Sequence, residues 1–315
     1  MKLRLIQIDH ADQAAIRAEL LHGLQALPAT TAPKYLYDAL GARLFAAITE
    51  LPEYYPTRTE AAIFACHVDA IAACLPPATT LVDLGAGNCE KAARLFTPFQ
   101  VQRYVAVDIS VDYLRHSLDL LHRQYPALEL IGIGMDFSQH LTLPADLGTE
   151  PRLLFYPGSS IGNFTPDEAL AFLRQVHSAT NGGGLLIGVD LVKSIDVLEP
   201  AYDDPLGVTA AFNRNLLPHI NRLAGTDFRL DDWRHVAFFN RDQSRIEMHL
   251  EAVCATTVRW PEGERRFAAG ERIHTENSYK WRIDDFARLL ESAGFTGVQH
   301  WTDERGWFAV FLARA

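Results

Sequence analysis

Residues 80–91 read TLVDLGAGNCEK, and this stretch decides the fold. The apolar run at 80–84 has the composition of a buried strand. Gly85 and Gly87 then form a tight turn, after which a helix begins. A strand, a glycine-rich turn and the start of a helix make the first unit of a doubly wound α/β domain, which binds its ligand at that turn.

Short apolar runs continue beyond this stretch and alternate with amphipathic helical patterns. Strands separated by helices indicate βαβ units, in which a parallel sheet is covered on both faces. The helix after the fourth strand is marked by a candidate N-cap at Thr165, by Pro166 at its first position and by Glu168 in the place of a capping box. The further strands are predicted at 104–108, 128–133, 153–157 and 185–190.

The C-terminal segment ends the sheet differently. Residues 282–294 predict a helix closed by Gly294, and strands follow at 295–301 and 307–313. So short a turn between two strands makes them antiparallel, because a parallel pair needs a crossover. A mostly parallel sheet that ends in an antiparallel hairpin is typical of class I methyltransferases. The predicted fold class is therefore α/β, with a Rossmann-like sheet of seven strands.

The remaining residues break this alternation and predict a second lobe of α+β type. Helical patterns and strand-like segments replace it, at 16–27, 38–50, 205–223, 233–239 and 245–254. We therefore divide the chain into a cofactor-binding methyltransferase domain at 59–192 and 280–315, and a substrate-binding lobe at 1–58 and 193–279.

The composition is that of a globular chain with an acidic balance. Among 315 residues, 29 Lys and Arg oppose 39 Asp and Glu, so the formal net charge is −10. No block of cations provides a footprint for nucleic acid or an anionic membrane, and no apolar stretch approaches the ~18 residues of a membrane span. Four cysteines without a C-x-x-C pair and twelve histidines without H-E-x-x-H spacing require no metal. We expect a cytoplasmic monomer that acts on a small molecule.

The glycine loop itself disfavours one class of ligand. A dinucleotide fingerprint reads G-x-G-x-x-G and places the pyrophosphate against the helix N-terminus. Gly85 and Gly87 fit this pattern, but the third position is Glu90, whose carboxylate would repel a pyrophosphate. The loop therefore favours a ligand without phosphate, such as S-adenosylmethionine, over the nicotinamide cofactor of a dehydrogenase.

Polar and aromatic residues at the ends of the next two strands fit the same ligand. Asp108 ends the second strand and can accept hydrogen bonds from a ribose diol. Asp136 and Phe137 follow the third strand, where a carboxylate and a ring suit the adenine amino group and its base. Lys91 can meet the carboxylate of the methionine part. Taken singly, Asp108 is equally well explained as a helix cap, and Lys91 as a solvated helix residue.

Seven motifs occur in order along nearly the whole chain: PKYLYDALGARLF (33–45), LPEYYPTRTEA (51–61), LGAGNCEK (84–91), SSIGNFTP (159–166), AYDDPLGVTAAFNRN (201–215), RIEMHL (245–250) and TENSYKW (275–281). Together they resemble the S-adenosylmethionine-dependent L-histidine Nα-methyltransferases of ergothioneine biosynthesis. Fungal N-methyltransferases of tryptophan derivatives are similar as well. The resemblance implies transfer of up to three methyl groups to the α-nitrogen of L-histidine, which gives the betaine hercynine.

The resemblance also implies residue roles. Cofactor binding would rest on Gly85, Lys91, Asp108, Asp136 and Phe137. Histidine would be held by Tyr54, Asn163, Tyr202, Glu276 and Ser278, with Tyr37 near the amine. Two positions depart from the family pattern, since Asn88-Cys89 replaces a pair of small hydroxyl residues and Phe164 replaces a leucine. Neither departure removes a predicted contact, but both bear on cofactor affinity or pocket shape.

Methyl transfer requires a neutral amine whose lone pair points at the methyl carbon, and the enzyme contributes largely by positioning. We expect Asn163 and Tyr37 to be the catalytic residues, because their oxygen atoms can accept hydrogen bonds from the amine N–H groups and so turn the lone pair toward the methyl carbon. The rings and hydroxyls of Tyr54 and Tyr202 suit a methylammonium product and a carboxylate. In isolation, each of these tyrosines is more typical of a half-buried core.

Glu276 and Ser278 lie two apart in an extended segment and so face the same side. A carboxylate and a hydroxyl there can serve the two imidazole nitrogens, whereas an indole would leave part of the pair unsatisfied. Met248 alternates with Ile246 and Leu250, a core pattern that also allows a substrate-binding place in the pocket wall. The alternatives are an N-methyltransferase of another amino acid, such as tryptophan or a histidine derivative, and a non-catalytic regulator that binds the cofactor.

Overall fold

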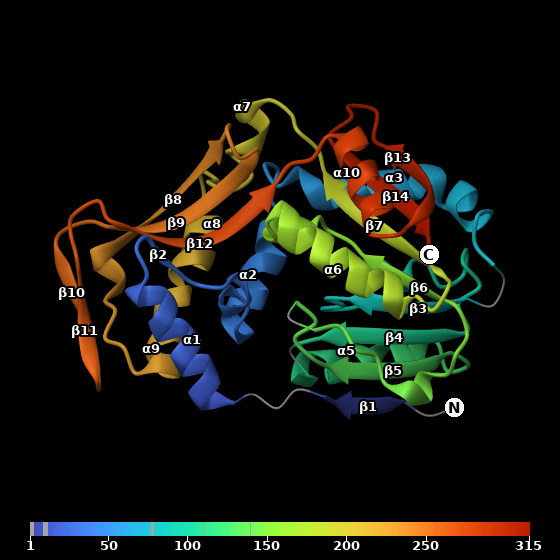
Figure 1. Ribbon diagram of the computed structural model, residues 1–315, viewed down its shortest axis with the longest axis horizontal. Coiled ribbons are helices and arrows are strands. Elements are labelled where there is room, and N and C mark those ends of the chain that lie inside the picture. The colour runs from blue at the N-terminus through green and yellow to red at the C-terminus, as the bar shows by residue number, and fades with distance from the viewer. Residues whose placement is uncertain (1–2, 9–11, 77–78, 110, 139) are drawn as a thin grey trace. The chain divides into compact units, whose positions relative to one another are not determined.

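The computed structural model describes residues 3–8, 12–76, 79–109, 111–138 and 140–315 (Figure 1). The chain forms two compact units, each built from segments that are distant in the sequence. The first unit comprises Met1–His10, Arg58–Leu191 and Trp281–Ala315, and the second comprises Ala11–Thr57 and Val192–Lys280. No helix in the described ranges is both long and apolar enough to cross a membrane.

The first unit is built on an eight-stranded sheet with the order β1-β5-β4-β3-β6-β7-β14-β13 (Figure 1). The strands are parallel except for β14, which pairs antiparallel with both β7 and β13. This arrangement confirms the predicted class I methyltransferase fold with its C-terminal hairpin. The strands are β1 (Arg4–Gln7), β3 (Thr80–Leu84), β4 (Arg103–Asp108), β5 (Glu129–Gly134), β6 (Arg152–Tyr156), β7 (Gly184–Asp190), β13 (Thr296–Thr302) and β14 (Phe308–Arg314).

The sheet has one strand more than the seven predicted. β1 pairs in parallel with β5, so that Leu5 lies opposite Gly132 and Ile6 opposite Ile133. Leu5 and Ile6 pack against different cores of the sheet, which explains why even so short a strand is held at its edge. The assignment of this N-terminal segment to the substrate-binding lobe is therefore wrong.

Alternate side chains of each strand enter two separate cores. On β3, Val82 lies in one core and Leu81 in the other. The first core is covered by α6 (Pro166–Ala179) and α10 (Ile283–Ser292), and the second by α3 (Tyr55–Ala72), α4 (Glu90–Ala93) and α5 (Val111–Gln124). Thr165 and Glu168 form the predicted capping box at the start of α6.

The second unit is built on a four-stranded sheet with the order β2-β12-β9-β8, and it also contains the hairpin β10-β11. Its strands are β2 (Ala29–Thr30), β8 (Trp233–Asn240), β9 (Arg245–Ala252), β10 (Thr256–Trp260), β11 (Gly263–Phe267) and β12 (Arg272–Tyr279). Its helices are α1 (Gln13–Gln25), η1 (Pro33–Leu36), α2 (Ala39–Thr49), α7 (Ile195–Leu198), α8 (Val208–Arg214), α9 (Leu216–Ala224) and η4 (Leu230–Asp232).

The helix predicted near 205–223 is two helices in the structure, α8 and α9. Pro218 lies in the first turn of α9 and has no backbone N–H, so a continuous helix would lack the bond to the Arg214 carbonyl. The prediction of one long helix is therefore wrong, and the break follows from a proline that a purely hydrophobic pattern conceals.

Candidate functional site

The loop after β3 reverses the chain through three left-handed residues. Gly85, Gly87 and Cys89 have φ angles of 74°, 53° and 62°, a region that glycine enters without the steric cost that Cys89 bears. The backbone N–H of Gly87 donates to Oδ2 of Asp108 across 2.9 Å. A Cβ atom at Gly85 would stand 3.7 Å from the ring of Phe137. The fold thus brings three of the predicted cofactor residues to one loop.

Two further predicted residues follow other strands of the same sheet, β5 and β6. Asp136 comes shortly after β5, and its Oδ1 accepts the backbone N–H of Ser138 at 3.2 Å. Asn163 ends the short helix η3 (Ser160–Asn163) that follows β6. Its half-buried side chain makes no hydrogen bond to the described part of the chain. Both residues therefore lie at the carboxyl edge, where open α/β sheets bind ligands.

Lys91 forms an ion pair with Glu60, an acid to which the sequence analysis assigns no role. Glu60 is 2% exposed, its Oε2 accepts from Nζ of Lys91 at 2.7 Å, and its Oε1 accepts the backbone N–H of Gly158 at 2.8 Å. Glu60 thereby holds Lys91 beside the loop that follows β6. Glu60 precedes the buried Ile63 by three residues on α3, so the two side chains lie on the same face of this helix. This spacing in the sequence could have indicated that Glu60 is buried.

Asp83 is a second buried acid of this unit to which the sequence analysis assigns no role. It is 2% exposed, and its Oδ2 accepts the hydroxyl of Tyr104 at 2.7 Å. Burial raises the pKa of Asp83 to about 7, the Tyr104 hydrogen bond opposes this rise, and the nearby Asp108 adds to it. The available signal was a lone carboxylate inside the apolar run TLVDL.

Five aromatic rings of the second unit form one continuous cluster. Tyr37 lies edge-on to Phe45 and to Phe212, with ring centroids 5.4 Å apart in both pairs. Phe45 meets Tyr54 at 6.1 Å, and Tyr54 meets Tyr202 at 6.2 Å. The fold therefore joins all three predicted substrate tyrosines, which come from distant segments of the chain.

Tyr202 connects this cluster to a buried polar group. Its hydroxyl oxygen lies 2.7 Å from Oγ of Ser278. Nζ of Lys280 donates to both oxygens, at 3.0 Å to Tyr202 and 2.7 Å to Ser278. Lys280 is only 3% exposed and has no role in the sequence prediction, although its position two residues after Ser278 was the available signal.

The register of β9 and β12 places the predicted imidazole contacts on one face. Glu276 is paired with Met248, and Ser278 with Ile246. An irregularity between His274 and Glu276 shifts the alternation, so His274 is paired with His249 instead and faces the other way. Met248, Glu276 and Ser278 therefore share the face that the sequence predicts.

The Glu276 carboxyl group is buried and incompletely satisfied. The residue is 8% exposed, and Oε2 has no hydrogen-bond partner among the described residues. Burial raises the pKa of Glu276 to about 7, against the opposing effect of the Lys280 cation. Because a buried polar atom without a partner is costly, this oxygen is suited to a donor that a ligand supplies.

Three side chains on the opposite face of the same sheet are close enough to hold a metal ion. Glu247, His249 and His274 offer ligand atoms within 4.8 Å of one another. Glu247 is already engaged, because Oε1 accepts from Arg245 and Asn240 while Oε2 lies 3.0 Å from Nε2 of His249. A divalent cation would also face the Arg245 guanidinium, so the contacts favour a hydrogen-bonded network over a metal centre.

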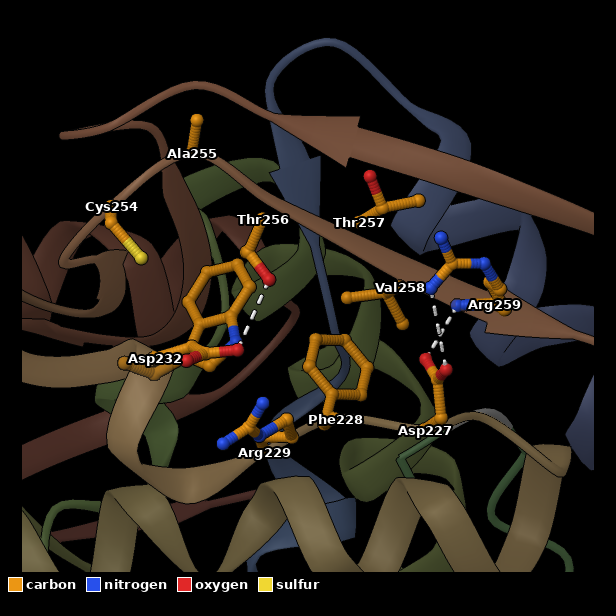
Figure 2. Close-up of a pocket in the computed structure, with 11 residues that line it drawn as sticks. Asp227, Phe228, Arg229, Asp232, Cys254, Ala255, Thr256, Thr257, Val258 and Arg259 are labelled. Atoms are coloured by element: carbon orange, nitrogen blue, oxygen red, sulfur yellow. Dashed lines mark hydrogen bonds and ion pairs between the residues drawn. The ribbon is translucent and has the colours of Figure 1, made fainter.

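The second unit contains a pocket of about 380 Å³, lined by residues from 227–233 and 254–259. Figure 2 shows the side chains that line it. None of the predicted site residues lines it. Its charged and polar groups are largely paired, since Asp227 lies 3.8 Å from Arg259 and Asp232 accepts from Thr256 at 3.1 Å. The pocket is thus separate from the buried group around Ser278.

Comparison with known proteins supplies independent evidence. Residues 16–315 match the model of a family described as histidine-specific, SAM-dependent methyltransferases. The chain is 41% identical to the histidine N-alpha-methyltransferase of Mycolicibacterium smegmatis over 99% of both chains. It is 40% identical to the protein of that name from Mycobacterium tuberculosis, over 97% of this chain and 96% of the relative. It is also 30% identical to ergothioneine biosynthesis protein 1 of Schizosaccharomyces pombe, over 88% of this chain and 38% of that protein.

Proposed function

The chain belongs to the family of histidine-specific, SAM-dependent methyltransferases, and on this premise we propose that it methylates the α-nitrogen of L-histidine. Up to three transfers would give the betaine hercynine, the first step of ergothioneine biosynthesis. Similarity to two histidine N-alpha-methyltransferases over nearly their whole length supports this substrate. The structural observation that carries the proposal is the buried oxygen of Glu276, which has no hydrogen-bond partner among the described residues and lies on the same sheet face as Ser278.

The first unit would hold the methyl donor, S-adenosylmethionine, whose sulfonium carries an electrophilic methyl group. The left-handed turn at Gly85 leaves room beside the Phe137 ring, which would stack on adenine. The Asp108 carboxylate, oriented by the Gly87 N–H, would accept from the ribose hydroxyls. Lys91, held by Glu60, would meet the methionine carboxylate. Asp136 would accept from the adenine amino group.

The α-amine of the substrate must be neutral to attack, although a terminal amine is mostly protonated near neutral pH. We assign Asn163 and Tyr37 to orienting the neutral amine, because each has an oxygen that can accept a hydrogen bond from an amine N–H and so aim the lone pair. Asn163 has a side chain without a hydrogen bond to the described chain, so its amide is available for a ligand. The two residues would act by positioning, which supplies several kcal/mol of a barrier in such displacements.

The aromatic cluster would hold the growing positive charge. A trimethylated nitrogen cannot donate hydrogen bonds, so the rings of Tyr37 and Tyr54 would stabilise it through cation–π attraction, worth roughly 0.5–2 kcal/mol. The hydroxyl of Tyr54 would bind the substrate carboxylate. Met248, which is paired with Glu276, would close the wall of the imidazole pocket.

The choice of imidazole follows from one acceptor and one donor on the same face. Glu276 would accept the ring N–H, and Ser278 would donate to the other ring nitrogen. An indole has one N–H and no acceptor, and a phenyl ring has neither, so both would leave buried polar groups unpaired. An aliphatic amino acid would likewise leave Glu276 and Ser278 without hydrogen-bond partners, so we expect it to bind more weakly than histidine.

This function is tested by incubating the protein with S-adenosylmethionine and a panel of amino acids, followed by mass spectrometry. Histidine is expected to gain mass in steps of about 14 Da, up to three steps, while tryptophan and phenylalanine stay unchanged. The predicted selectivity would be wrong if another amino acid were methylated in preference to histidine. A panel without any product, from a protein shown to bind S-adenosylhomocysteine, would favour a non-catalytic role.

A further inference from the structure

Lys280 is a buried lysine whose ends are both fixed within the second unit. Its backbone N–H donates to the Ser244 carbonyl at 2.8 Å, and its own carbonyl accepts from Oγ of Ser244 at 2.9 Å. At the other end, Nζ contacts Ser278 and Tyr202 and stands 4.8 Å from the centre of the Tyr202 ring. The ammonium is therefore held in one place, although a lysine side chain is ordinarily flexible.

The hydrogen-bond roles in this group follow from counting protons. An ammonium has three donors and no acceptor, so the oxygens of both Ser278 and Tyr202 must accept from Lys280. Each hydroxyl carries one proton, and the 2.7 Å bond between the two oxygens uses one of these two protons. When Tyr202 donates to Ser278, the Ser278 oxygen accepts twice and its own proton must point elsewhere.

Ser278 shares its face with Glu276, the residue whose carboxyl oxygen has no partner in the described chain. From this geometry we propose that Lys280 is a positioning residue for substrate recognition, which holds the Ser278 hydroxyl as a donor toward the substrate ring nitrogen. The inference rests on the proposed function, because it names the residue that sets the donor side of the imidazole site. Glu276 sets the acceptor side.

The charge of Lys280 acts on the acceptor side as well. Burial alone would drive the Glu276 carboxyl group to its neutral form, and the neighbouring Lys280 cation opposes this. Lys280 thus favours the ionised form of Glu276, which can accept a hydrogen bond. It also holds the Ser278 hydroxyl, which can donate one. This pair complements a neutral imidazole, which has one N–H and one lone pair.

A direct contact between Lys280 and the substrate carboxylate is the competing role for the same residue, and the two roles differ in how the variants combine. If Lys280 acts through Ser278, removing Ser278 after Lys280 is gone has little further effect. If Lys280 binds the carboxylate itself, the two losses add, since the contacts are then independent.

The test is a double-mutant cycle of Lys280→Met and Ser278→Ala, read as the Kd for histidine by calorimetry at saturating S-adenosylhomocysteine. Each single variant is expected to weaken histidine binding on the order of 10-fold to 100-fold, as for a hydrogen bond with a charged partner. The double variant is expected to lose at most a few fold more than Lys280→Met alone. The KM for histidine should rise more than kcat falls, because positioning of the ring affects binding first.

Three controls separate this role from a general effect on the fold. Lys34→Met removes another lysine of the same unit, one that pairs with Glu19, and should leave the Kd for histidine unchanged. The Kd for S-adenosylhomocysteine should stay constant in all variants. Lys280→Gln keeps an N–H donor without the charge, so it should bind histidine better than Lys280→Met.

Both Lys280 variants should require a higher pH for full histidine binding, because the Glu276 carboxyl group loses its neighbouring cation.

Wild-type affinity for histidine in Lys280→Met, or additive losses in the cycle, would overturn the inference. If Lys280→Met fails to fold, Lys280→Gln is used in its place. Histidine binding by Lys280→Gln with the same pH dependence as wild type would also overturn the inference. A wild-type protein that binds a different amino acid would contradict the proposed function instead. The same cycle would then be measured with that amino acid, and the same two outcomes would decide the role of Lys280.

Discussion

The hydroxyl oxygens of Tyr202 and Ser278 lie 2.7 Å apart in the buried interior, although the two residues are 76 positions apart in the chain. This bond joins the aromatic cluster that includes Tyr37 and Tyr54 to the polar face that carries Glu276. One unit therefore combines rings suited to a methylated ammonium with groups suited to an imidazole.

Replacing Glu276 with alanine should separate the two binding functions. Loss of the proposed acceptor for the ring N–H is expected to weaken histidine binding by about 100-fold, since hydrogen bonds to charged groups are worth roughly 1.5–3 kcal/mol. S-adenosylhomocysteine binding should change by less than about twofold. Calorimetry with each ligand checks this, with the exposed Asp242→Ala as the matched control. Equal losses for both ligands would count against the assigned role of Glu276.

The raised pKa of Glu276 makes stability depend on pH. In the folded chain this pKa is about 7, against an ordinary value of 4.5. The folded state therefore binds more protons than the unfolded state between these values, and this contribution to stability falls as pH rises through that window. Glu276→Gln removes the titration, so it should stabilise the protein relative to wild type at pH 8, by an amount on the order of 3 kcal/mol.

The difference at pH 5 should be small, because wild-type Glu276 is then largely neutral. Urea unfolding of both proteins at pH 5 and pH 8 measures the two differences. A difference in unfolding free energy that is the same at both pH values would show that Glu276 titrates normally.

Asp108 should matter for the cofactor alone. Asp108→Ala removes the acceptor of the Gly87 N–H and the proposed ribose contacts. S-adenosylhomocysteine is expected to bind about 10-fold to 100-fold more weakly, as for the loss of charged hydrogen bonds. Asp119, an exposed acid on α5, provides the control variant Asp119→Ala. Unchanged cofactor affinity in Asp108→Ala would place the ribose elsewhere.

Glu60 should contribute to both stability and cofactor binding. In Glu60→Gln the amide can still accept the Gly158 N–H, but it no longer pairs with Lys91. Because Lys91 is 41% exposed and can be solvated, the expected loss of stability is modest, about 1–2 kcal/mol. Thermal unfolding and S-adenosylhomocysteine titration measure the two effects. Weaker cofactor binding without a stability loss would still fit a positioning role, whereas no change in either would not.

Features of the fold with a local cause could be predicted from the sequence. The turn at Gly85, the capping box at Thr165 and the C-terminal hairpin each follow from neighbouring residues. The break at Pro218 was also local, but the apolar spacing around it continues and conceals it. β1 is too short for a periodic pattern to identify, and its pairing and packing partners all lie far along the chain.

The candidate site was predictable only in part, for a related reason. Asp108 and Asn163 lie near strand ends, where the fold class itself directs attention. Glu60 and Lys280 are ordinary charged residues until tertiary structure buries them, and burial depends on partners that are distant in sequence. Their partners Lys91 and Ser278 were predicted, so each missed residue lies one contact beyond a predicted one.

The most direct test of the central claim is the position of the transferred methyl groups. The protein is incubated with L-histidine and S-adenosylmethionine carrying a ¹³C-labelled methyl group, and the product is examined by NMR. We predict one methyl resonance that corresponds to three equivalent groups on the α-nitrogen, with the imidazole nitrogens unmodified. Label on an imidazole nitrogen, or no label on histidine while another amino acid is methylated, would contradict the account.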